Sequence, residues 1–190
     1  MSIHVSEKLS FRKKDLEALL TASETLLSQT ETFSASLSDY LTCQSSFSAE
    51  KKEHRAQKVI SLVLFQELCH TYNKKLEKMS KELEAAYSFF EQAFFSFQDS
   101  NPINFIFDFV TDEKKALLCN FHSETSFRNS VLLMYSSLMK HFCSLTRNYL
   151  LKNYGAAQDE VKKVTLYATQ VKQILSVTTS VALNFSPYSQ

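Results

Sequence analysis

"LVLFQELCHTYNKKLEKMSKELEAAYSFFEQAFFSF", residues 62–97, places apolar or aromatic side chains at alternating intervals of three and four positions. The members of this register are Leu62, Phe65, Cys69, Tyr72, Leu76, Met79, Leu83, Ala86, Phe90, Ala93 and Phe97. Such spacing is that of a coiled-coil seam, which keeps one face of a helix against a neighbouring helix. It predicts one long helix from about residue 49 to 98, about 75 Å in length at 1.5 Å per residue.

The scarcity of turn-forming residues extends this prediction to the whole chain. The 190 residues include one glycine, Gly155, and two prolines. An average chain of this length contains about thirteen glycines, at ~7%. Hairpins and tight β-turns need Gly, Pro, Asn and Asp for their special backbone angles. The sequence therefore predicts an all-α fold: one helical domain over 1–190, an elongated antiparallel bundle with coiled-coil-like packing.

A first helix is predicted over about residues 10–44. Ser10 is a candidate N-cap, and Leu16, Leu20, Leu27, Leu37 and Leu41 follow a three-four register with small hydroxyl residues between them. Thirteen of the twenty-eight residues from 21 to 48 are Ser or Thr, which are mediocre helix formers. We expect packing to stabilise this helix, and a partly disordered arm is the alternative. A reversal is predicted at 42–48, with Ser48 as the N-cap of the long helix.

The second half of the chain predicts four further helices, two of them short. Asn101 and Pro102 are a suitable N-cap and first residue for short helices over 102–122, with a strand at 103–109 as the alternative. A longer helix is predicted over 124–154, ended by Gly155 as a C′ residue, and a last one over 156–184. The apolar stripes of the two long helices are Phe127, Val131, Met134, Leu138, Phe142, Leu145 and Tyr149, then Val161, Val164, Ala168, Val171, Leu175, Thr178, Ala182 and Phe185.

Charge and apolar content limit the classes of function. The formal net charge is +1, from 21 basic and 20 acidic residues, which argues against binding to nucleic acid through phosphate neutralisation. No apolar run is long enough for a transmembrane helix, and the N-terminus lacks the apolar region of a signal peptide. Four widely spaced cysteines indicate free thiols in a reducing compartment. We expect a cytoplasmic protein, or one exported without a cleaved signal peptide.

The sequence offers little that indicates catalysis. Glu67 and His70 have the Glu-x-x-His spacing of di-metal bundles, but only one such motif is present and the register directs both residues outward. Cys119 and His122 are three positions apart, and two ligands do not make a tetrahedral metal site. We therefore predict no catalytic, metal or cofactor site and no enzymatic activity. A metal-dependent helical-bundle enzyme is a distant alternative.

Residues 87–110 contain eight of the sixteen phenylalanines. The register makes the end of the long helix apolar nearly all round, which predicts burial on more than one side. We expect most of these rings to form a core where the chain folds back. The alternative is that part of the cluster docks a partner. The candidate partner-binding residues are Phe89, Phe94, Phe95, Phe105 and Phe109.

These patterns predict a non-enzymatic interaction or scaffold protein. Two long apolar registers in one short chain exceed what a slim monomer covers, which favours a homodimer or a complex with another helical protein. The uncharged segment 173–190 is expected either inside the bundle or against a partner.

The alternative function is a membrane-surface module, similar in plan but not in any motif to curvature-binding (BAR-like) modules. Long helices with basic patches are compatible with peripheral binding to anionic lipid. The candidate lipid-binding residues are Lys51, Lys52, Arg55, Lys74, Lys75 and Lys78.

Overall fold

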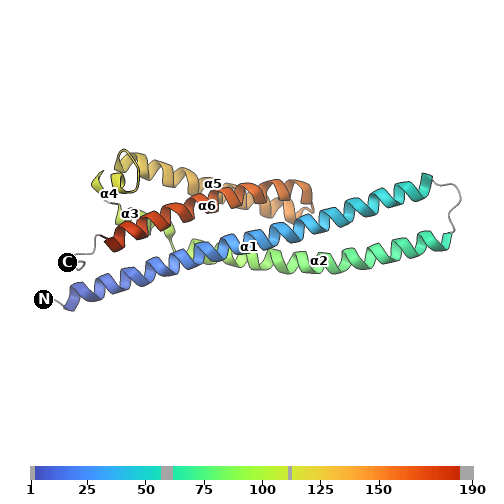
Figure 1. Ribbon diagram of the computed structural model, residues 1–190, viewed down its shortest axis with the longest axis horizontal. Coiled ribbons are helices and arrows are strands. Elements are labelled where there is room, and N and C mark those ends of the chain that lie inside the picture. The colour runs from blue at the N-terminus through green and yellow to red at the C-terminus, as the bar shows by residue number, and fades with distance from the viewer. Residues whose placement is uncertain (1–2, 57–61, 111–112, 185–190) are drawn as a thin grey trace.

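A computed structural model describes the backbone of residues 3–56, 62–110 and 113–184. The prediction of an all-α fold is confirmed, because these residues form six helices and no strand. The helices are α1 (Ile3–Ala56), α2 (Leu62–Asp99), α3 (Pro102–Phe109), α4 (Glu113–Leu118), α5 (Glu124–Leu150) and α6 (Tyr154–Asn184). Figure 1 shows a molecule much longer than it is wide.

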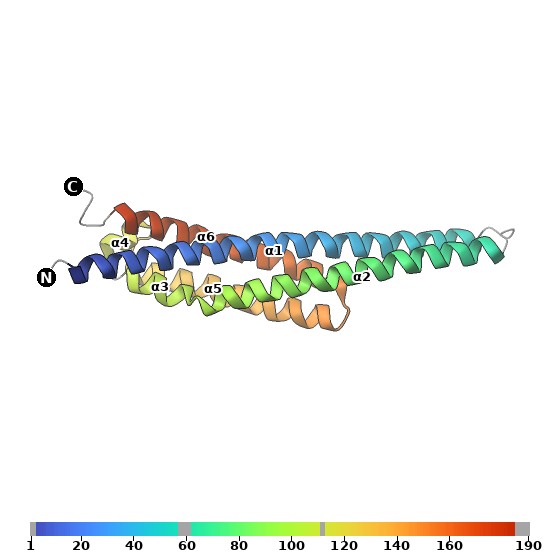
Figure 2. The ribbon, with the colours of Figure 1, turned by 90° about the horizontal axis from the view of Figure 1, so that it is seen from below.

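The molecule has two parts that differ in how many helices they contain. Helix α2 returns along α1, and α5 and α6 lie along only one half of this pair (Figure 2). We call this half the bundle half. The other half, Leu41–Ala56 of α1 and 62–82 of α2, we call the extension. Tyr154, the first residue of α6, contacts Tyr40 of α1 with ring centroids 5.2 Å apart, which marks the base of the extension.

Aromatic rings fill the centre of the bundle half. Phe33 of α1 stacks on Phe90 of α2 at 5.4 Å, and Phe94 of α2 stacks on Phe142 of α5 at 3.5 Å. All four side chains are buried. Rings of this size dominate the apolar area that a small core removes from water. The predicted aromatic core at the end of the long helix is therefore present, and it joins three of the four long helices.

The predicted seam of α2 changes in burial along its length. From Leu83 to Phe97 its members are buried, whereas Phe65, Tyr72 and Met79 are only half-buried and Leu62 is exposed. The buried part faces α1 and α5 together, and the half-buried part faces α1 alone. The stripes predicted for α5 and α6 are also buried or half-buried wherever side chains are described; Ala182 and Phe185 lie outside those residues.

The predicted register of α1 was half correct. Leu16, Ser23, Thr30 and Leu37 are buried, as the pattern indicates. The register missed Leu19, Leu26 and Phe33, which are buried because α1 packs against both α2 and α6 and so needs a wider apolar face. The hydroxyls at Ser23 and Thr30 donate to the backbone carbonyls of Leu20 and Leu26, at 2.7 and 2.6 Å. Buried polar groups are tolerated when they are bonded in this way.

The predicted reversal at 42–48 is wrong, because α1 continues without a break to Ala56. The backbone of Ser10 and of Ser48 therefore lies inside α1 and not at a helix start, and the long helix begins at Leu62 rather than near residue 49. The Ser and Thr hydroxyls bond within the helix, as Thr42 does to Ser38 and Ser48 does to Gln44. No Gly or Pro interrupts this stretch, and Cys43 and Phe47 keep a buried face. The alternatives of a disordered arm and of a strand at 103–109 are wrong as well, since both segments are helical.

The predicted helix ends at Asn101 and Gly155 also need correction. Pro102 is the first residue of α3, but Asn101 makes no side-chain cap and adopts a left-handed conformation with φ of 54°. Helix α5 ends at Leu150, not at Gly155, and Lys152 supplies the left-handed residue of the α5–α6 turn with φ of 58°. Gly155 lies in the first turn of α6 and has no positive φ. At these two turns the left-handed conformation is therefore adopted by Asn101 and Lys152, not by a glycine.

Candidate functional site

The five candidate phenylalanines do not form one surface. Phe94 belongs to the core, Phe105 is half-buried, and the side chain of Phe109 lies outside the described residues. Phe89 and Phe95 are about half exposed. They are six positions apart on α2, which places them about 120° apart around the helix. Phe95 also packs edge-on against Phe142, with ring centroids at 5.8 Å.

All of the candidate basic residues except Lys51 are exposed, and two of the six contact other side chains. Lys78 pairs with Glu82 at 3.6 Å; the neighbouring Lys81, which is not a candidate, pairs with Glu77 at 2.9 Å. The hydrogen bond from Lys81 lowers the pKa of Glu77 below its usual value. Lys51 is half-buried and lies 4.0 Å from the centre of the Phe47 ring, a cation–π contact. Lys52, Arg55, Lys74 and Lys75 are exposed on the extension.

The interior of the extension consists of one layer of contacts between α1 and α2. Phe47 stacks on Tyr72 with ring centroids 4.8 Å apart, and the Tyr72 hydroxyl donates to the Glu50 carboxylate. That bond to an anion is the main cause of a raised pKa for Tyr72. Leu41, Leu76 and Met79 are only half-buried. The extension therefore has a seam but no enclosed core.

Two groups of exposed leucine and valine side chains lie at the two ends of the extension, and exposed leucines such as Leu133 also occur on the bundle half. At the tip of the extension, Leu62, Val63 and Leu64 are 71, 59 and 57% exposed. At its base, in the α5–α6 turn, Leu150 and Leu151 are 67 and 68% exposed. The sequence pattern predicted Leu62 as a seam residue, and it is exposed because the facing helix ends at Ala56. Contiguous exposed apolar residues at a protruding position are typical of an interaction site.

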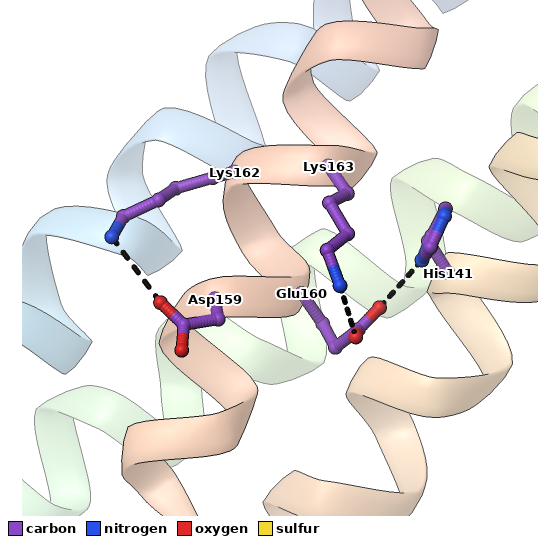
Figure 3. Close-up of polar contacts among 5 residues, drawn as sticks. All are labelled: His141, Asp159, Glu160, Lys162 and Lys163. Atoms are coloured by element: carbon purple, nitrogen blue, oxygen red, sulfur yellow. Dashed lines mark hydrogen bonds and ion pairs between the residues drawn. The ribbon is translucent and has the colours of Figure 1, made fainter.

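A polar cluster links α5 and α6 in the bundle half, as Figure 3 shows. The His141 Nδ1 atom lies 2.6 Å from Glu160 Oε2, and Lys163 Nζ donates to Glu160 Oε1 at 2.9 Å. Burial acts to raise the pKa of Glu160, but the bonds from Lys163 and His141 outweigh it and the pKa is lowered. The His141 ring also stacks on Tyr167. The contact between His141 and Glu160 therefore joins α5 to α6, and we call this cluster the polar clamp.

The motifs with possible metal chemistry do not come together. Glu67, His70 and His122 are exposed, while Cys119 is buried. Burial raises the pKa of the Cys119 thiol, which makes it a poor nucleophile. Among the described residues, no three His, Cys, Asp or Glu side chains lie close enough to bind one metal ion. All four cysteines are unpaired.

A partly open hollow of about 290 Å³ lies between α4, α5 and α6. It is lined by Cys119, Phe121, Phe127, Met134, Gln170, Gln173, Ile174 and Val177. Most of its wall is apolar, and no charged side chain lines it. It therefore lacks the convergent polar groups that fix a ligand in a specific site.

Comparison with protein-family models, with curated proteins and with solved structures found no match. None of the helices in the described parts of the chain has the sustained apolar stretch that spans a bilayer.

Proposed function

We propose that this chain is a non-enzymatic interaction protein that binds a helical protein, of its own or another sequence, through the extension. The bundle half supplies a rigid base with an aromatic core. The extension supplies an apolar seam that α5 and α6 leave uncovered. In this proposal α1 and α2 pack there as an antiparallel, coiled-coil-like pair. The three-four spacing from Phe65 to Leu83 supports that geometry.

The observation that carries the proposal is the exposure of Leu62, Val63 and Leu64 at the tip. Three consecutive large apolar residues on a described helix are costly to leave in water, at about 25 cal/mol per Å². Binding of an apolar partner removes that cost. Among the described residues, the start of α2 lies at the end of the molecule that is far from α5 and α6 (Figure 1).

The test is a capture experiment with three forms of the chain. The wild type, a tip variant (Leu62→Ser, Val63→Ser, Leu64→Ser) and a control variant on the bundle half (Leu132→Ser, Leu133→Ser, Leu166→Ser) serve as bait. Both variants replace three exposed apolar residues, so they match in hydrophobicity lost. Any captured protein is then purified, and its affinity for each form is measured by calorimetry.

We expect the tip variant to lose binding and the control to keep it. Equal binding by all three forms, together with a strictly monomeric wild type, contradicts the proposal. Circular dichroism on each variant verifies that helix content is unchanged, which is expected for exposed positions.

Membrane-surface binding is the second candidate, and the same apolar tip favours it, because exposed basic residues such as Lys52 and Arg55 lie nearby on α1. Its weakness is the charge of the extension, where seven basic side chains accompany five acidic ones in 41–56 and 62–82. Clusters that recognise anionic lipid contain several basic residues without such compensation. Cosedimentation with anionic vesicles tests it, with the triple variant Lys74→Glu, Lys75→Glu, Lys78→Glu as the comparison.

A further inference from the structure

The α1 face that packs against α6 continues into the extension, past Tyr154, the first residue of α6. In the bundle half this face makes contacts such as the ion pair between Glu24 and Lys172, at 3.2 Å. Past Tyr154 nothing in the described chain covers it. The surface there is open and comes from α1 alone: Leu41 is half-buried, and Gln44, Ser45, Ser48, Ala49 and Lys52 are exposed. An established helix-packing face thus runs on, without a partner, along the extension.

The two exposed apolar groups belong to elements at opposite ends of the extension. The start of α2, which carries Leu62, Val63 and Leu64, is at the tip, and the α5–α6 turn, next to Leu150 and Leu151, is at the base (Figure 2). The sixteen residues from Leu41 to Ala56 give the face a length of about 24 Å.

We propose that a second copy of this chain covers the extension, side by side and in the opposite direction. This inference rests on the proposed function and names the partner. A two-fold axis through the middle of the two extensions places the tip of each copy against the α5–α6 turn of the other. Leu62 of one copy then lies near Leu151 of its partner, and the contact occurs twice, as two-fold symmetry requires.

Such a pairing extends the four-helix architecture through the whole dimer. In each copy, the extension of the partner packs against α1 and α2 in the way that α5 and α6 pack against them in the bundle half. The half-buried seam residues, among them Phe65, Leu76 and Met79, become part of a four-helix core. The two uncovered lengths match because they belong to identical chains.

Charge favours a second copy over an anionic surface. The described extension carries seven basic and five acidic side chains, a net charge of +2. That excess is too small for strong repulsion between two copies, and an exposed acidic residue such as Glu67 can face basic residues of the other copy. The contacting ends, Leu62–Leu64 and Leu150–Leu151, are uncharged.

The size of the face sets the expected affinity. Two helices side by side are about 20 Å wide, so a length of about 24 Å gives about 480 Å² per copy in projection, or about 960 Å² for both. This lies just below the ~1,200 Å² of standard stable interfaces. We therefore expect a dimer that dissociates in the micromolar range.

The experiment is sedimentation equilibrium of the full chain from low to high micromolar concentration. The wild type is expected to rise from 21.8 kDa towards twice that mass. Leu62→Glu and Leu151→Lys, at the most exposed position of each group, should each weaken the dimer at least about tenfold, because an unpaired charge then faces leucine. The double variant brings glutamate and lysine together and should return to within about threefold of the wild type. Leu133→Glu, at a position as exposed as Leu151, is the control and should change nothing.

Several outcomes overturn the inference. A wild type of 21.8 kDa at every concentration excludes the dimer. A double variant as weak as the single ones excludes the contact between tip and turn. If the wild type stays monomeric while the tip still captures a different protein, or anionic vesicles, this inference fails and binding through the tip stands. If the tip captures nothing either, the proposed function fails with it.

Discussion

The bundle half and the extension use the same two helices in different surroundings. In the bundle half, α1 and α2 are covered by α5 and α6, and Phe33, Leu83 and Phe90 are fully buried. In the extension the same register continues, but Phe65, Leu76 and Met79 remain half-buried. The three-four pattern therefore determines which face of a helix is apolar, and the number of neighbouring helices determines how much of that face is removed from water.

The largest expected effect comes from one substitution made in each part. Phe90→Ala should lower the free energy of unfolding by about 3–5 kcal/mol, because it leaves a cavity in a fully enclosed core. Phe65→Ala, on the same seam of α2, should cost about half as much or less, since a half-buried site already contacts water. Urea unfolding followed by circular dichroism measures both. Equal losses would show that the extension is covered in solution.

A proline in α1 tests whether the helix continues through the extension. Ser45→Pro should destabilise the chain by about 3 kcal/mol, because it removes a helical hydrogen bond and clashes with the preceding turn. Ser45→Ala is the control, and it should be neutral or slightly stabilising, since alanine is the better helix former. Tolerance of the proline would restore the reversal predicted at 42–48.

The polar clamp of the bundle half predicts a dependence on pH. The pKa of Glu160 is lowered in the folded chain, so its contribution to stability is complete above the usual glutamate pKa and is lost as pH falls through the folded value. Glu160→Gln should cost about 1 kcal/mol at neutral pH. The variant should also lose less stability than the wild type on acidification. If the wild type and Glu160→Gln lose the same stability on acidification, Glu160 is not the cause of the pH dependence.

The smallest expected effect is the difference in stability between two variants that each lose one tyrosine hydroxyl. Tyr72 in the extension donates to Glu50, and Tyr87 in the bundle half donates to Glu91 at 3.0 Å and accepts from Thr146 at 3.2 Å. Burial is the main reason that the pKa of Tyr87 rises to about 12. Tyr87→Phe should cost about 1 kcal/mol and Tyr72→Phe should cost less, because solvent replaces the exposed bond of Tyr72 more readily. Thermal unfolding of both variants gives the order, and the reverse order contradicts this assignment.

Much of the fold could be predicted from periodicity, and the exceptions have physical causes. The seam of α2 and the stripes of α5 and α6 were predicted well because each helix has one dominant apolar face. In α1 the pattern missed Phe33, since a helix with two neighbours buries residues off the main seam. The many serines and threonines led to the prediction that the first helix ends near residue 42. Helix propensities did not reveal that their hydroxyls bond to the helix backbone here.

The candidate site was less accessible to sequence reasoning. The phenylalanine count drew attention to residues 87–110, but Phe94 there is part of the core. The exposed Leu150 and Leu151 were missed, because an apolar residue at the end of a helix cannot be distinguished from a buried one without knowing where the helix ends. Exposure of Leu62 likewise depends on the last residue of a different helix.

The unbroken length of α1 fixes the distance between its two ends. Its 54 residues form a rod of about 80 Å that runs through both parts of the molecule. Labels placed in its first and last turns would therefore stay at a nearly fixed separation, whatever happens in the shorter helices. A molecule built around such a rod can act as a spacer, which sets how far apart two objects bound at its ends are kept.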